Sequence, residues 1–136
     1  MKVFISYSSK DEALATRIVA SLEAAGLDAW YSKREIMPGD NWAEKIANGL
    51  KESNAMVVLV TPDALESDAV QSSISYALSE RTFNRRLIPV IVGDSADFAK
   101  DRIPWIFNRL KTIKLSKDGK NEEQFKKIAQ VLKDAA

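Results

Sequence analysis

Cysteine and histidine are both absent from the 136-residue sequence. Disulfides and thiolate metal sites are therefore excluded, and so are Cys–His and Ser–His–Asp catalysis. An enzyme built on this chain would have to draw its acid or base from a carboxylate, a lysine or a tyrosine. We expect neither a metal nor a resident cofactor, and a soluble intracellular protein.

An excess of charge of one sign is also missing, since 20 Lys and Arg stand against 19 Asp and Glu. A net charge of +1 does not favour binding to nucleic acid or to an anionic membrane. No apolar run is long enough to span a membrane, and the short N-terminal one does not match a signal peptide. We therefore expect a cytoplasmic protein with neither nucleic acid nor membrane as partner. Residues 1–136 fit one domain with a sizeable core.

The sequence alternates short apolar runs with helical patterns. Strands are expected at residues 3–5, 27–31, 55–60, 87–92 and 111–115, and helices at 9–25, 42–50, 67–81 and 121–133. This alternation predicts an α/β fold, a flavodoxin-like three-layer sandwich. Its five-stranded parallel sheet would have the order 2-1-3-4-5, with helices on both faces. Pro89 lacks an N–H and should place the fourth strand toward a sheet edge or at a bulge.

Several local patterns predict where elements begin, end and pack. Ser9 and Glu12 have the spacing of a capping box, and Gly26 is the expected glycine after the first helix. Trp42 is expected to pack its helix. Residues 98–110 are expected to be irregular or short-helical and to be packed down by the apolar residues between 103 and 107. The helix at 67–81 has an apolar stripe that fixes its register: Val70, Ile74, Ala77 and Leu78.

Hydroxyl groups follow the first strand, where ligands of parallel sheets gather. Ser6, Ser8 and Ser9 lie there, and no glycine occurs between residues 6 and 11. The missing glycines argue against a dinucleotide-binding fingerprint and a P-loop. The third strand ends in Val60 and Thr61 rather than in the aspartate of a phosphoacceptor receiver.

Motifs in the same order and spacing resemble the Toll/interleukin-1 receptor (TIR) domain family, closest to its bacterial branch. The matching stretches are residues 4–11, 26–31, 34–40, 42–50, 53–62 and 86–90, which cover nearly the whole chain. The resemblance implies two kinds of work. Some TIR domains recruit others through the loop corresponding to Ser32 to Asp40, the BB loop, and through the helix at 67–81. Others cleave or cyclise NAD+ between nicotinamide and ribose.

The resemblance also places the catalytic groups of the NAD+-cleaving members. Their glutamate follows a tryptophan by four residues, in a context like Ser-x-Trp-Val-x-x-Glu, and a carboxylate there stabilises an oxocarbenium-like ribose. In this chain Ala69 occupies the tryptophan position and Ser73 the glutamate position. Serine carries no charge, and losing one transition-state contact of this kind costs about 3 kcal/mol.

Three hypotheses follow. The first is a TIR interaction module whose NAD+ site is degenerate, with Ser73 inactive and with a pocket that can still hold a nucleotide. The second is an active NAD+ hydrolase or cyclase that uses a displaced acid such as Glu35, Glu66 or Glu80. The third is a chain altered at Ala69 and Ser73 from an active parent, and we favour the first because a required carboxylate is missing.

NAD+ is thus a possible substrate or ligand rather than a cofactor, in a pathway of immunity or virulence by family analogy only. The residues expected around such a ligand are Phe4, Ser6, Ser8, Trp30, Arg34 and Ala69. Each also has a purely structural interpretation. Phe4 can belong to the core, Trp30 can pack its strand, and Arg34 can be a solvated loop charge.

Overall fold

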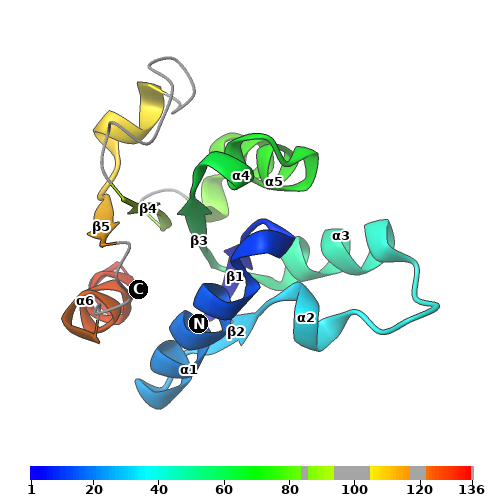
Figure 1. The fold of residues 1–136 in the computed structure, drawn as a ribbon, viewed down its shortest axis with the longest axis horizontal. Helices are drawn as coiled ribbons and strands as arrows, with labels where there is room; N and C mark the ends of the chain where they lie inside the picture. Colours follow the sequence, from blue (N-terminus) through cyan, green and yellow to red (C-terminus); the bar gives the residue numbers. More distant parts are fainter. Residues whose placement is uncertain (84–85, 94–104, 117–121, 136) are drawn as a thin grey trace.

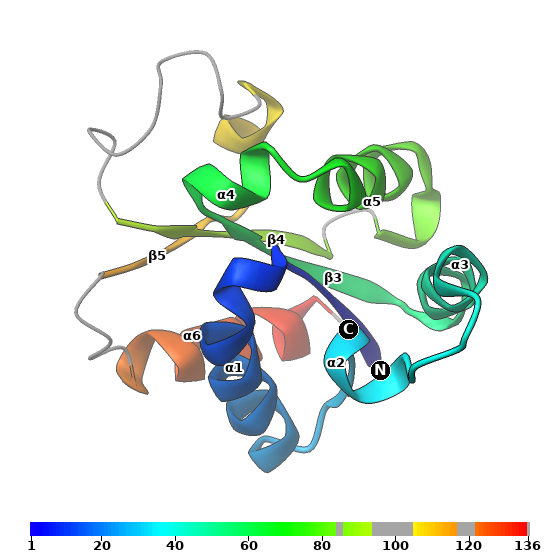
Figure 2. The same ribbon diagram turned by 45° about the vertical axis from the view of Figure 1, so that its right-hand side comes forward.

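The computed structural model describes residues 1–83, 86–93, 105–116 and 122–135, and Figures 1 and 2 show two views of it. Its strands are β1 (Lys2–Ser6), β2 (Asp28–Trp30), β3 (Ala55–Val60), β4 (Leu87–Val92) and β5 (Ile113–Leu115). All neighbouring strands are parallel, and their order is β2-β1-β3-β4-β5. The predicted sheet order and α/β class are therefore confirmed.

Helices connect the strands and cover both faces of the sheet. The longer ones are α1 (Glu12–Ala24), α3 (Trp42–Glu52), α5 (Asp68–Ser79) and α6 (Glu122–Asp134). Shorter helical turns are η1 (Ser9–Asp11), α2 (Ser32–Glu35), α4 (Pro62–Leu65), η2 (Arg81–Phe83) and η4 (Trp105–Arg109). In Figure 2, α1 and α6 lie on one side of the sheet, and α4 and α5 on the other. Within these described ranges, the structure contains no candidate membrane-spanning helix.

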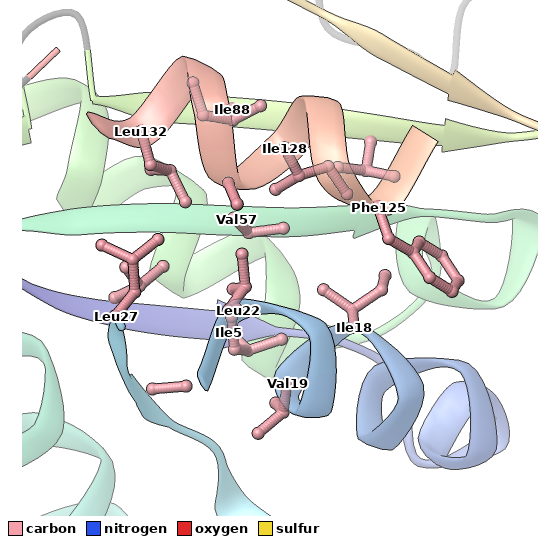
Figure 3. Close-up of a cluster of buried hydrophobic side chains, with 14 of the residues drawn as sticks. Ile5, Ile18, Val19, Leu22, Leu27, Val57, Ile88, Phe125, Ile128 and Leu132 are labelled. Atoms are coloured by element: carbon pink, nitrogen blue, oxygen red, sulfur yellow. The ribbon is translucent and has the colours of Figure 1, made fainter. Parts of the chain in front are cut away.

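Side chains alternate between the two faces along β1, and this alternation positions the candidate site. Val3 and Ile5 enter the cluster under α1 and α6, which Figure 3 shows with Ile18 and Ile128 among its members. Phe4 enters the opposite cluster, which includes residues of α5. Both faces of the sheet therefore carry an apolar cluster. On the face of Phe4, some side chains of this cluster also line the candidate site described below.

Strand β3 is buried at every residue, as expected for a central parallel strand. β4 is not an edge strand, but it lies next to the short edge strand β5, which pairs only with residues 90–92. The Met56 N–H donates to the Arg86 carbonyl, and alternate residues of a parallel strand face the same neighbour. The backbone nitrogen of Pro89 therefore faces β5 rather than β3. Since β4 pairs with β5 only from Val90 onward, the missing N–H of Pro89 removes no hydrogen bond from the sheet.

Two local predictions need correction. Ser8, not Ser9, is the capping residue: its Oγ accepts the Lys10 N–H at 3.4 Å, and α1 follows the short helix η1 without a side-chain cap. The segment from Ser32 to Asp40 is not all loop, because its first four residues form α2. Gly26 ends α1 as predicted, with φ of +89°.

Three predicted packing residues are exposed instead. Leu78 is 47% exposed. The buried stripe of α5 consists of residues 70, 73, 74 and 77, so it includes Ser73 and leaves Leu78 outside. Trp42 is 51% exposed at the first turn of α3. Trp105 is 71% exposed at the start of η4, whereas Phe107 is buried as expected. The part of that prediction on residues 98–104 lies outside the described residues, as does Asn121 at the start of the last helix.

Candidate functional site

Two adjoining cavities open at the carboxyl ends of β1 and β2. The inner cavity has a volume of about 50 Å³, and the outer cavity about 400 Å³. The inner one is lined by Phe4, Ile5, Ser6, Tyr7, Trp30, Ser32, Trp42, Ile46, Ala69, Val70 and Ser73. The outer one is lined by Tyr7, Ser9, Glu12, Ser32, Lys33, Ile36, Trp42, Ser67 and Ala69. Because four residues line both, we treat the two cavities as one cleft.

Ser73 lies at the inner cavity and is 3% exposed, on the face of α5 that packs on the sheet. Its Oγ donates to the Val70 carbonyl at 2.8 Å and lies 2.5 Å from Oγ of Ser6. Since Ser73 has one hydroxyl hydrogen, Ser6 is the donor between the two. The pair is neutral and satisfied, so it closes this end of the cavity without any charge.

Aromatic rings form one wall of the inner cavity. Phe4 and Trp30 stack with ring centroids 4.8 Å apart and planes 8° apart, and they are 2% and 5% exposed. Both interpretations of Trp30 are therefore met, since it packs its strand and lines the cavity. Phe4 belongs to the core, and its face is already covered by Trp30. Each ring therefore has one face covered by the other, and both side chains are almost fully buried.

Arg34 lies in α2 and turns away from the cleft. Its guanidinium donates to both carboxylate oxygens of Glu23 at 2.8 Å and stands 5.0 Å over the ring of Tyr31. Hydrogen bonding from Arg34 lowers the pKa of Glu23, and the same bond raises the pKa of Arg34. Arg34 does not line either cavity, and Ser8 is likewise occupied as a helix cap.

The structure brings together five of the seven predicted site residues. Phe4, Ser6, Trp30, Ala69 and Ser73 all line the inner cavity, while Ser8 and Arg34 line neither cavity. The proposed displaced acids Glu35, Glu66 and Glu80 are also missing from both linings, within the part of the chain that the structure describes. No charged side chain of that part lines the inner cavity.

Sequence reasoning missed several residues that line the cleft, among them three with polar or aromatic side chains that could act on a ligand. Tyr7 and Trp42 line both cavities, and Glu12 is the one acidic residue of the described ranges that lines either of them. Glu12 Oε2 lies 4.0 Å from Nζ of Lys33, which lines the same outer cavity. Tyr7 lies within the hydroxyl-rich stretch after the first strand, which was the available signal. The position of Glu12 depends on how η1 turns the chain, which no periodicity reveals.

A second carboxylate, that of Asp11, precedes Glu12 in the chain and lines neither cavity. Asp11 accepts a 2.6 Å hydrogen bond from Oγ1 of Thr61, which itself accepts the Ala64 N–H and caps α4. Burial raises the pKa of Asp11, the bond from Thr61 opposes that rise, and the charge of Asp63 adds to it. Asp11 therefore joins the chain after β1 to the chain after β3. No group of three or more acids in the described ranges is placed to hold a metal ion.

A model of the TIR domain family matches residues 3–131. The stimulator of interferon genes protein of Magallana gigas is 25% identical over 123 residues, covering 88% of this chain and 29% of that protein. The probable 2' cyclic ADP-D-ribose synthase TcpO of Methanobrevibacter olleyae is 35% identical over 66 residues, covering 48% of this chain and 19% of that protein. This chain thus spans less than a third of either relative.

Solved structures show the same fold. The TIR domain of the Toll-related receptor TRR-2 from Hydra magnipapillata has a TM-score of 0.70 at 22% identity, covering 97% of this chain and 95% of that one. The TIR domains of the activated Roq1 resistosome also give a TM-score of 0.70, at 15% identity and with 99% of both chains covered. At these identities the likeness shows the architecture alone.

Proposed function

Because this chain belongs to the TIR domain family, we propose that it is a cytoplasmic signalling and interaction module whose NAD+-cleavage site is degenerate. It acts by self-assembly or by contacts with other TIR domains. Residues 1–136 form the single TIR domain that makes these contacts. The cleft retains the shape of a ligand site and can hold a nucleotide without cleaving it.

The observation that carries this proposal is the buried hydroxyl pair of Ser6 and Ser73. It stands where the family resemblance expects a carboxylate. An oxocarbenium-like ribose needs negative charge beside it, and a neutral hydroxyl held by Val70 and Ser6 supplies none. The inner cavity, at about 50 Å³, has room for only a few water molecules in this conformation.

Two exposed apolar side chains support a role in assembly. Met37 in the segment from Ser32 to Asp40 is 59% exposed, and Leu78 on α5 is 47% exposed. They lie on the two elements through which the family resemblance expects TIR domains to meet. The Roq1 resistosome, whose TIR domains share this fold, is itself an assembly by its description.

A second candidate function is NAD+ cleavage with Glu12 as the acid. The observation that favours it is that Glu12 lines the outer cavity, while the relative from Methanobrevibacter olleyae is described as a probable cyclic ADP-ribose synthase. Nicotinamide release by the unmodified chain that is lost in Glu12→Gln would establish this alternative.

Light scattering tests the assembly proposal through Gly39, whose φ is +91°. We expect the parent to self-associate as its concentration rises and Gly39→Ala to remain smaller, because alanine is strained by about 1–2 kcal/mol in this conformation. Gly26→Ala is the matched control: its φ is +89°, and at both glycines a new Cβ meets no atom within 4 Å.

Gly26 lies outside the segment from Ser32 to Asp40, so Gly26→Ala should lose stability without losing association. Pro38→Ala, which frees the backbone beside Gly39, should also weaken association. A parent that stays monomeric at all concentrations, or a Gly39→Ala variant that associates as the parent does, contradicts the assembly proposal.

A further inference from the structure

We infer that the hydroxyl of Tyr7 couples occupancy of the cleft to the position of α2 and the segment that follows it, an inference that rests on the function proposed above. Tyr7 is the first residue after β1 and lines both the inner and the outer cavity. A ligand that extends from one cavity to the other therefore passes this side chain. Its hydroxyl also contacts the beginning of α2.

The phenol oxygen of Tyr7 accepts two hydrogen bonds from α2. One comes from Oγ of Ser32 at 2.9 Å, and the other from the backbone N–H of Lys33 at 3.2 Å. The Tyr7 ring is held in turn against Tyr31, with centroids 6.4 Å apart and planes 47° apart. Tyr7 is thus fixed by its neighbours and serves as an attachment point for α2 on the cleft side.

Helix α2 has little else to hold it in place. None of its four residues is buried. In the described ranges its ion pairs are that of Arg34 with Glu23, away from the cleft, and the 4.0 Å contact of Lys33 with Glu12, both on α1. A segment with few buried apolar contacts depends on its polar contacts for its position and opens easily. A change at Tyr7 should therefore be felt along α2 and the residues up to Asp40.

The chemistry of Tyr7 indicates the kind of ligand that it recognises. Its two acceptor sites are filled by Ser32 and Lys33, while its own hydrogen has no acceptor among the described residues. Tyr7 can therefore donate to a ligand oxygen. The Lys33 ammonium lines the outer cavity, paired only weakly with Glu12 at 4.0 Å, and it favours an oxygen that carries negative charge. The inferred ligand group is a phosphate ester oxygen of a nucleotide.

A ligand oxygen that accepts a hydrogen bond from Tyr7 should strengthen the hydrogen bonds from Ser32 and Lys33 to the Tyr7 oxygen. Donation by the phenol makes its oxygen a better acceptor for Ser32 and Lys33. Occupancy of the cleft should therefore hold α2 more firmly against β1, and an empty cleft should leave it looser. Because Met37 lies two residues after the end of α2, its exposed side chain would be presented to a partner in a more fixed position.

Hydrogen exchange of the backbone amides from residue 33 to 37 tests the coupling, with ADP-ribose as the probe because it lacks the nicotinamide bond. We expect ADP-ribose to slow this exchange about fivefold in the parent, the effect of roughly one hydrogen bond. Tyr7→Phe keeps the ring and removes only the hydroxyl. Its exchange should be about fivefold faster without ligand and unchanged by ADP-ribose.

Tyr76→Phe is the matched control, because Tyr76 lies on α5 edge-on to Phe83 and lines neither cavity. It should respond to ADP-ribose as the parent does. The inference is overturned if the parent does not respond, if Tyr7→Phe exchanges like the parent, or if Tyr7→Phe still responds fully. Self-association measured on the same samples separates the two proposals: association without an exchange response contradicts the coupling alone, and the converse contradicts assembly alone.

Discussion

The Ser73 hydroxyl shows how much one side chain decides. The hydroxyl of Ser73 forms its hydrogen bonds with nearby groups, because it donates to the Val70 carbonyl and accepts from Ser6. The floor of the inner cavity is therefore neutral. A glutamate would bring a charge that is costly to bury without a partner and useful only beside a developing cation. The serine present here therefore gives a closed and neutral floor, which is what the proposed degenerate site requires.

We predict that the Ser6–Ser73 pair contributes to stability as a unit. Ser73→Ala leaves the buried Ser6 hydroxyl without its acceptor and should lower the free energy of unfolding by about 1–3 kcal/mol. Ser6→Ala should cost less, because Ser73 keeps its bond to Val70. In urea unfolding, the double variant should cost less than the two single changes added together.

Ser72→Ala is the control for this cycle, since Ser72 is the exposed neighbour on the same helix. It should be neutral or slightly stabilising, because alanine has the higher helix propensity. Strictly additive effects of the Ser6 and Ser73 changes would show that the hydrogen bond between them contributes nothing.

At the scale of elements, α3 approaches β2 so closely that only glycine fits between them. A Cβ at Gly49 would lie 2.5 Å from Cε2 of Trp30. Trp30 cannot move aside easily, since it is 5% exposed and stacked on Phe4. Trp30 therefore both lines the cleft and forms the surface against which α3 packs at Gly49.

Gly49→Ala tests this close approach. In an open helix the change would stabilise by about 0.5–1 kcal/mol, but here overpacking should destabilise by about 1–3 kcal/mol. Asn48→Ala, at the exposed neighbouring position, is the control and should be nearly neutral. Thermal unfolding distinguishes the two, and a Gly49→Ala protein that melts above the parent would mean that Trp30 yields freely.

The elements also show why some features were predictable and others were not. The burial of β3 follows from its unbroken apolar run, and that of α6 from its apolar periodicity. The sequence therefore predicts the bounds of both elements within a residue or two. The register of α5 was likewise fixed by Val70 and Ile74, which placed Ala69 and Ser73 at the cleft. The turn of α2, the cap at Ser8 and the exposure of Leu78 depend on how neighbouring segments meet, which a one-dimensional pattern does not contain.

In the whole molecule, the two faces of the sheet differ in structure, because the cleft lies on only one of them. The face under α1 and α6 is lined by a continuous apolar cluster (Figure 3). The opposite face combines core residues such as Phe4 and Trp30 with the cleft. Because β1 sends alternate side chains to the two faces, residues at the cleft can change while the main core stays intact. This division allows a TIR fold to persist where the expected carboxylate is absent.

Release of nicotinamide from NAD+, followed at high protein concentration, tests whether the cleavage site of this chain is degenerate. We predict no release by the parent above a protein-free blank. Ala69→Trp/Ser73→Glu should raise the rate at least about a hundredfold above any residual value, as expected for one restored electrostatic contact. Ala69→Trp/Ser72→Glu, with the same charge on the exposed neighbour, should stay inactive. Efficient release by the parent would contradict the account, because the neutral floor at Ser6 and Ser73 would then not limit the chemistry.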